Sequence, residues 1–247
     1  RIEEDYLRII RFIRFSLLYK NEIEKNIIEV IKLNLNGIKK ISKERILVEL
    51  FKILNTKNFK KFNNNQSLKE IFLLIFPEFK YFERLNKLNE ITSSGIFDKT
   101  IFLSILLIDE KNNHEYFLHK YNVSNNLKDD LNLITKNYLN SLENKNFFKK
   151  DLKKNIFYFG KKHLELLSLV CFSINKKIKL DDYLDILNNI KKISLPQFPF
   201  DGNYLIDKGI KEGKSVGKTL KLIQDEWLNN GFNISDQRIS EIIDKQK

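Results

Sequence analysis

Residues 1–15 read RIEEDYLRIIRFIRF, and most of the uncharged positions in this stretch are large and apolar. This pattern predicts a largely buried helix that runs from residue 1 to about residue 20. Five charged side chains interrupt the apolar run: Glu4, Asp5, Arg8, Arg11 and Arg14. At about 100° per residue, Glu4 and Asp5 flank Arg8, and the other arginines continue the stripe. The stretch is therefore either a core helix with a solvent-facing stripe of ion pairs or a prepared polar site.

The rest of the chain favours an all-α fold. At 247 residues and 42% hydrophobic composition, it can bury a sizeable core. Three prolines and eight glycines are few, which favours long helices over turn-rich sheets. No stretch alternates apolar and polar residues in the manner of a strand. We therefore predict an elongated array of packed helices.

Apolar periodicity, caps and breakers give the expected helix bounds. A helix at 23–35 should end at Asn36-Gly37, and Ser42 should cap a helix within 41–54. Further helices are predicted at 68–76 (stopped near Pro77), 78–90, 98–108 (after a TSSG loop at 92–95), 114–121, 125–142, 147–158, 161–175 and 181–192. A short helix, a glycine turn, a long helix through Trp227 and a last helix capped by Ser235 follow.

The formal charge of +12 and the isoelectric point near 9.5 predict a polyanionic partner, with nucleic acid as the first candidate. The lysines are scattered along the chain, which predicts a long, diffuse phosphate-binding surface. No apolar run approaches the ~18 residues that a membrane-spanning helix needs. We expect no membrane partner.

The chain offers little catalytic or metal-binding chemistry of its own. The single cysteine, Cys171, lies in an apolar run, which excludes an internal disulfide and suits a reducing cytosol. The three histidines have neither cysteine partners nor an HExxH spacing, so no metal site is predicted. No serine nucleophile motif and no pair of aspartates two residues apart is present. We expect no catalytic residue in this chain.

The run GKSVGKT at 213–219 is close to a phosphate-binding loop but has the wrong spacing. That loop needs four residues between its first glycine and the Gly-Lys-Ser/Thr triplet, and here three residues separate them. The preceding segment is helical rather than a buried strand. The glycines are therefore interpreted as a tight junction between helices.

Three segments resemble one known family. EDYLRIIRFIRF (4–15) resembles the EDxxR helix of class II tRNA nucleotidyltransferases, which include CCA-adding enzymes and bacterial poly(A) polymerases. ISKERILVELFKIL (41–54) resembles the helix that follows in this family. LPQFPFDGNYLIDKGIKEGKSVGKTL (195–220) resembles its C-terminal LPxFPLSGxDLLxxGxxxGPxVGxxL pattern. The order and spacing of the segments agree with the family from end to end.

The resemblance implies a helical neck (1–65), body (66–145) and RNA-binding tail (146–247) that follow a catalytic head. That head would carry Gly-Ser and Asp-x-Asp signatures and bind the Mg²⁺ ions that promote phosphoryl transfer. The chain has no methionine and opens inside a helical pattern. We therefore expect a C-terminal part of a longer cytoplasmic protein, inactive without its head.

The resemblance also implies a role for the opening stripe, with CTP and ATP as substrates and tRNA, not DNA, as partner. Asp5 and Arg8 would read the base edge that cytosine and adenine share, with Glu4 orienting Arg8. Arg11 and Arg14 would reach toward the triphosphate or the RNA 3′ end. The implied activity is addition of CCA to tRNA. The alternatives are a poly(A) polymerase of the same family and a non-catalytic helical RNA-binding protein.

Overall fold

The computed structural model describes residues 2–19, 24–91 and 97–246. Within these ranges every regular element is an α-helix or a short 3₁₀-helix, which confirms the all-α fold. None of the described helices combines the length and the apolar character that crossing a bilayer requires. The predicted TSSG loop and the predicted start of the second helix at residue 23 lie outside the described residues.

The elements follow one another with short connections. The α-helices are α1 (Leu7–Tyr19), α2 (Lys25–Asn34), α3 (Lys43–Leu54), α4 (Gln66–Ile75), α5 (Leu85–Asn89), α6 (Lys99–Leu107), α7 (Asn113–Tyr121), α8 (Asn125–Glu143), α9 (Leu152–Phe159), α10 (Lys161–Ile174), α11 (Leu180–Lys192), α12 (Gly202–Asp207), α13 (Lys214–Asn229) and α14 (Asp236–Asp244). The 3₁₀-helices are η1 (Leu35–Lys40), η2 (Phe59–Asn64) and η3 (Phe82–Arg84).

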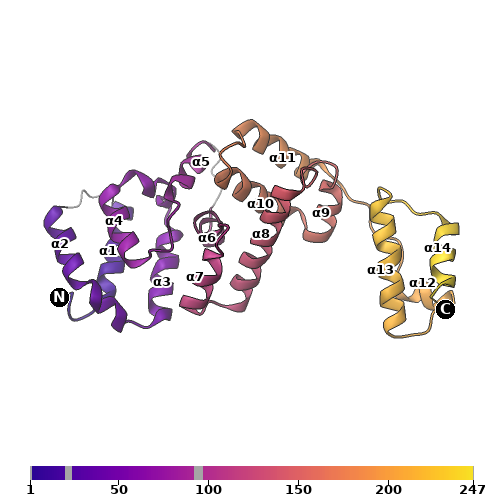
Figure 1. Ribbon diagram of the computed structural model, residues 1–247, viewed down its shortest axis with the longest axis horizontal. Coiled ribbons are helices and arrows are strands. Elements are labelled where there is room, and N and C mark those ends of the chain that lie inside the picture. The colour runs from indigo at the N-terminus through magenta and orange to yellow at the C-terminus, as the bar shows by residue number, and fades with distance from the viewer. Residues whose placement is uncertain (1, 20–23, 92–96, 247) are drawn as a thin grey trace.

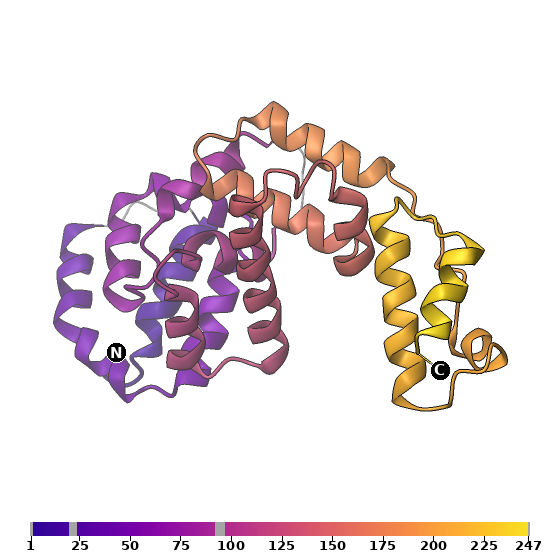
Figure 2. The same ribbon diagram turned by 45° about the vertical axis from the view of Figure 1, so that its right-hand side comes forward.

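The helices form an elongated arch with two hydrophobic cores (Figures 1 and 2). Helices α1–α4 make one end, α6–α11 continue it, and α12–α14 form a separate unit at the other end. The first core runs from Leu7 to Ile190, and the second from Leu205 to Ile243. The predicted boundaries at 65/66 and 145/146 both fall within the first core, and the division into neck, body and tail stays a prediction.

Phenylalanine rings fill the centre of the first core. Phe59 and Phe62 from η2 are fully buried, and the ring centroids of Phe59 and Phe102 lie 4.7 Å apart. The rings of Phe72 and Phe76 are tilted against each other, with centroids 4.8 Å apart. Buried aromatic rings contribute large apolar areas and favour tilted or edge-on contacts of this kind. The Asn-rich segment that follows Phe62 is therefore anchored to the core at its start.

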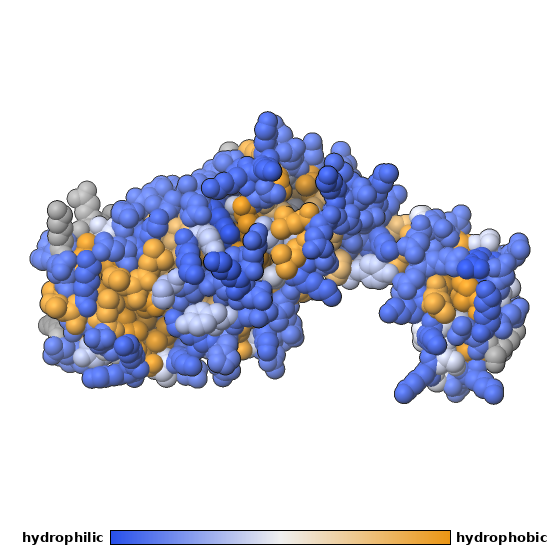
Figure 3. Space-filling model, viewed as in Figure 1, coloured by the Kyte–Doolittle hydropathy of each residue, from blue (hydrophilic) through white to orange (hydrophobic). Residues whose placement is uncertain are grey.

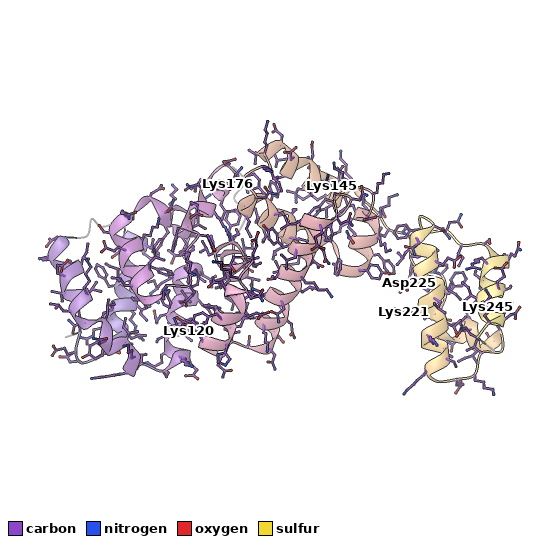
Figure 4. The ribbon with its side chains drawn as sticks, viewed as in Figure 1. Lys120, Lys145, Lys176, Lys221, Asp225 and Lys245 are labelled. Carbon is purple, nitrogen blue, oxygen red and sulfur yellow. The ribbon has the colours of Figure 1, made fainter. Side chains whose placement is uncertain are left out.

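An aromatic seam centred on Trp227 joins the second unit to the first. Trp227 contacts Phe157 of α9 at 5.7 Å and Phe232 at 4.8 Å between ring centroids. Beside the rings, the Tyr158 hydroxyl donates a hydrogen bond to Asp225 at 2.8 Å. Burial, and then this bond, raise the pKa of Tyr158 to about 12, so its hydroxyl keeps its proton at neutral pH. Figure 4 labels Asp225 on α13.

Most predicted helices are confirmed within a few residues, and the differences have local causes. The opening helix begins at Leu7 rather than residue 1, because the Asp5 carboxylate accepts the Leu7 N–H at 3.1 Å and holds a turn. The segment 78–90 is helical only from Phe82, since Phe79 and Phe82 both reach the core. The helix predicted at 147–158 starts at Leu152, after turns held by Asn144.

The second helix ends at Asn34, one residue from the predicted end, but Gly37 does not act as a left-handed helix terminator. The chain passes through Asn36-Gly37 as η1, and Gly37 is buried. The reason for glycine is space: a Cβ at Gly37 would overlap the ring of Tyr6. This close approach places the turn before α1 against η1, so a residue that looks like a helix terminator supports the opening segment instead.

We expect Gly37→Ala to lower the free energy of unfolding by about 1–3 kcal/mol, because the added methyl group overpacks a closed site. The matched control is Gly217→Ala in α13, where a Cβ would meet nothing within 4 Å. Alanine should stabilise that helix by up to about 1 kcal/mol. Thermal unfolding followed by circular dichroism measures both variants. Equal melting of Gly37→Ala and the wild type would contradict the packing argument.

Candidate functional site

The predicted site residues Glu4, Asp5 and Arg8 come together at the start of α1. Asp5 precedes the helix, and its backbone carbonyl accepts the Arg8 N–H at 3.1 Å. The Glu4 carboxylate pairs with the Arg8 guanidinium at 3.0 Å, as the i,i+4 spacing predicts. Both side chains are about half exposed or more, at 66% for Glu4 and 45% for Arg8. The edge is therefore open to a ligand.

Asp5 has a partner that sequence reasoning missed. Arg45 of α3 places its Nη2 atom 3.3 Å from both oxygens of the Asp5 carboxylate. Its backbone N–H is held by the Ser42 cap at 3.4 Å, which confirms the predicted start of α3. Charge-assisted bonds fix the orientation of a carboxylate better than neutral ones. The first turn of α3 therefore holds Asp5 from behind.

A buried carboxylate ties Arg11 and Arg14 to the same helix pair. Glu49 of α3, with a side chain 3% exposed, lies 3.6 Å from Arg11 Nε and 3.3 Å from Arg14 Nη1. Lys52 adds a third cation at 2.9 Å from the same carboxylate. Buried charges persist when they are paired in this way. Arg11 and Arg14 thus bridge α1 to α3, and their predicted reach toward substrate stays a prediction.

A signal for Glu49 was present in the sequence. Ile46, Glu49, Leu50 and Ile53 occupy positions i, i+3, i+4 and i+7, the spacing of one buried face. An acid inside such a stripe must find cations from another element. Arg11 and Arg14, one helical turn apart on α1, are those cations. Arg45, the partner of Asp5, carried no such signal, because its side chain is exposed and lies outside the buried stripe.

An apolar hollow of about 360 Å³ lies beside Arg8. Ile9 and Phe12 of α1 and Ile27 and Val30 of α2 contribute to its lining. Figure 3 shows apolar side chains gathered over the end of the molecule that α1–α4 form. Ligand pockets combine such apolar walls with a few polar groups that fix orientation. The start of α1 therefore offers both components.

The residues present do not fit a magnesium site. Among the described parts of the chain, no three His, Cys, Asp or Glu side chains come together as ligands. Carboxylates near the edge are engaged with cations: Glu4 with Arg8, Asp5 with Arg45 and Glu49 with the α1 arginines. Mg²⁺ prefers carboxylate oxygens supplemented by water and substrate phosphates. These side chains are therefore candidates for orienting a ligand rather than for binding the metal.

We expect Glu49→Ala to lower the free energy of unfolding by about 3–5 kcal/mol, because it leaves the largely buried Arg14 without its carboxylate. Glu44→Ala on the same helix is the matched control, because Glu44 is exposed and forms no ion pair with a described residue. Its effect should stay within about 0.5 kcal/mol. Thermal unfolding measures both, and equal effects would refute the role of Glu49.

Comparison with known proteins gives consistent matches. Residues 22–82 match a family model described as "Probable RNA and SrmB- binding site of polymerase A". The mitochondrial CCA tRNA nucleotidyltransferase 1 of Mus musculus is 24% identical over 99% of this chain and 56% of its own length. The CCA-adding enzyme of Staphylococcus aureus (strain Newman) is 32% identical over 53% of this chain and 31% of its own length.

Solved structures share the fold. A CCA-adding enzyme in complex with ATP has a TM-score of 0.63 at 21% identity, over 100% of this chain and 61% of that chain. A complex with CTP has a TM-score of 0.59 at 23% identity, over 99% of this chain and 60% of that chain. The chain spans about half the length of the mouse relative, or 56%. The chain is therefore similar over nearly its whole length to a helical portion of CCA-adding enzymes, and residues 22–82 also match the RNA-binding family model of polymerase A.

Proposed function

We propose that this chain selects CTP and ATP and binds tRNA in a protein that adds CCA to tRNA 3′ ends. The observation that carries the proposal is that a hydrogen-bond acceptor, the Asp5 carboxylate, and a donor, the Arg8 guanidinium, lie close together at the start of α1. Asp5 and Arg8 both lie there, and each has a charge partner, Arg45 and Glu4 respectively. Because the described residues do not fit Mg²⁺, the metal that activates the triphosphate would be bound elsewhere in the protein.

The chemistry of the two groups suits cytosine and adenine. A carboxylate accepts hydrogen bonds, and both bases carry an exocyclic amine that donates one. A guanidinium donates, and both bases place a ring nitrogen acceptor beside that amine. Uracil and guanine present a carbonyl and a ring N–H at the same positions. Asp5 with Arg8 would therefore accept C and A and reject U and G.

The contacts behind these two residues would keep the reading geometry in place. Arg45 holds the Asp5 carboxylate through one Nη2 atom, which leaves acceptor capacity on a group with about four lone-pair sites. The apolar hollow beside Arg8 would give the base a wall to rest on. Arg11, whose side chain is 43% exposed, would reach the triphosphate or the RNA 3′ end. Arg14 is 20% exposed and would support it.

The RNA partner is supported by charge and by the matched family model. The net charge of +12 favours a polyanion, and the model that matches 22–82 is described as an RNA-binding site. The same description names polymerase A, which favours poly(A) addition as the second candidate function. Both activities would use the same reading edge, since adenine is recognised in each.

We expect Asp5→Ala and Arg8→Ala, in the full-length protein, to lower kcat/KM for CTP and ATP by about 30-fold or more. Losing one member of a charged, hydrogen-bonded pair costs about 2 kcal/mol or more. Both variants should also narrow the discrimination against UTP and GTP. Glu3→Ala, an adjacent exposed acid outside the reading pair, is the matched control and should behave as the wild type. Unchanged nucleotide discrimination in both variants would contradict the proposal.

The two candidate functions separate in one assay. The full-length protein is given tRNA that lacks its 3′-terminal CCA, together with CTP and ATP, and the products are sequenced. CCA addition should yield a defined C-C-A end. A run of adenosines with no cytidine would instead identify a poly(A) polymerase, and absence of any transfer by a folded, Mg²⁺-supplied protein would favour a binding protein.

A further inference from the structure

The positive charge of this chain is unevenly distributed. Between residues 144 and 195 there are twelve lysines and five acidic side chains. Between residues 196 and 247 there are eight basic and eight acidic side chains. Residues 196–247, which include the separate C-terminal unit, therefore carry no net formal charge despite their lysines. In this half of the chain, the excess positive charge therefore lies on α9–α11 and the segments that flank them, rather than being spread evenly as the sequence analysis expected.

An open hollow of about 820 Å³ lies at this concentration, between the start of α9 and the end of α11. Side chains that line it include Lys149, Lys150, Lys153, Lys192, Phe148 and Asn189. All four lysines are exposed, and none forms an ion pair with a described residue. Charges of one sign around a concave surface reinforce one another and attract counter-charge.

The core below holds the walls of this hollow in place. Leu152 at the start of α9 is 3% exposed, and Ile190 near the end of α11 is fully buried. The end of α11 is also pinned by Lys161, whose Nζ atom donates to the Lys191 carbonyl at 2.9 Å. The lysine stems therefore project from fixed backbone, which lowers the entropy lost when a ligand binds.

Several basic side chains outside the hollow are engaged by acids. In the C-terminal unit, Arg238 is held by Glu226 and Glu241. At the other end of the molecule, the arginines of α1 and α3 pair with Glu4, Asp5 and Glu49. Figure 4 labels Lys145 and Lys176 among the helices α8–α11, and Lys221 and Lys245 on the C-terminal unit. The exposed lysines of α13 also form no ion pair with a described residue, but they belong to a unit without net charge. The four lysines of the hollow instead line one concave surface in a segment with an excess of positive charge.

We propose that this hollow is the main binding surface for the RNA backbone in this half of the chain, and that the neutral C-terminal unit adds little phosphate affinity. The inference rests on the proposed tRNA partner and names where the phosphates bind. Lysine acts as a flexible point charge and lacks the fork with which arginine reads base edges. The hollow would accordingly bind the backbone without regard to base sequence and position the RNA for the distant reading edge.

The test compares two fourfold variants of the full chain. One replaces Lys149, Lys150, Lys153 and Lys192 with glutamine, and the matched control replaces Lys211, Lys214, Lys218 and Lys221 of the C-terminal unit. Both remove the same charge from exposed positions. Binding of tRNA is measured by fluorescence anisotropy as a function of salt, and circular dichroism verifies that both variants keep their helices.

We expect the hollow variant to bind tRNA about 30-fold or more weakly at about 0.1 M salt. The slope of log K against log salt should become shallower by about 3, because each lost phosphate contact removes about 0.7–0.9. The control should change affinity less than about threefold. Equal losses in both variants, or a larger loss in the control, would overturn the inference while leaving tRNA binding intact. If the unaltered chain shows no salt-dependent tRNA binding, the proposed function and this inference both fail.

Discussion

The buried carboxylate of Glu49 determines how the two helices of the candidate site lie against each other. Its side chain is only 3% exposed, and three cations from α1 and α3 surround it. A sliding or rotating α1 would carry Arg11 and Arg14 away and leave a desolvated charge behind, at a cost of several kcal/mol. The contacts of Glu49 with Arg11 and Arg14 therefore also fix the position of Asp5, before α1, relative to Arg45 of α3.

Features of this structure that depend on interactions between near neighbours in the sequence were predicted well, and features that depend on contacts between distant residues were not. Ser42, Pro77 and Ser235 mark helix ends correctly because caps and breakers act within a few residues. Apolar periodicity placed Asp5 inside the first helix, but in the structure Asp5 precedes it. The Asp5 carboxylate accepts the Leu7 N–H, and this local bond competes with helical geometry in a way that periodicity does not reveal. Gly37 was misinterpreted because its need for space comes from Tyr6, which is distant in sequence.

The candidate site was half predictable for the same reason. Glu4 and Arg8 contact each other across one helical turn, so spacing alone paired them. The contact between Asp5 and Arg45 joins residues forty apart, and only the packing of α1 on α3 creates it. The resemblance to the family proposed Asp5 and Arg8 as reading residues and Glu4 as the support of Arg8, but it named no support for Asp5. The neck, body and tail division and the cytoplasmic location stay predictions.

The two units that meet at the Trp227 seam differ in the size of their hydrophobic cores. Among the described residues the second core contains six buried hydrophobic residues, far fewer than the first, so the C-terminal unit also depends on the contact of Trp227 with Phe157 of α9. Small cooperative units open at lower free energy than large ones. We therefore expect α12–α14 to loosen before the contacts of Glu49 with its cations are lost. The arch would thus combine a more stable part, where bases and phosphates would be positioned, with a C-terminal end that opens first on heating.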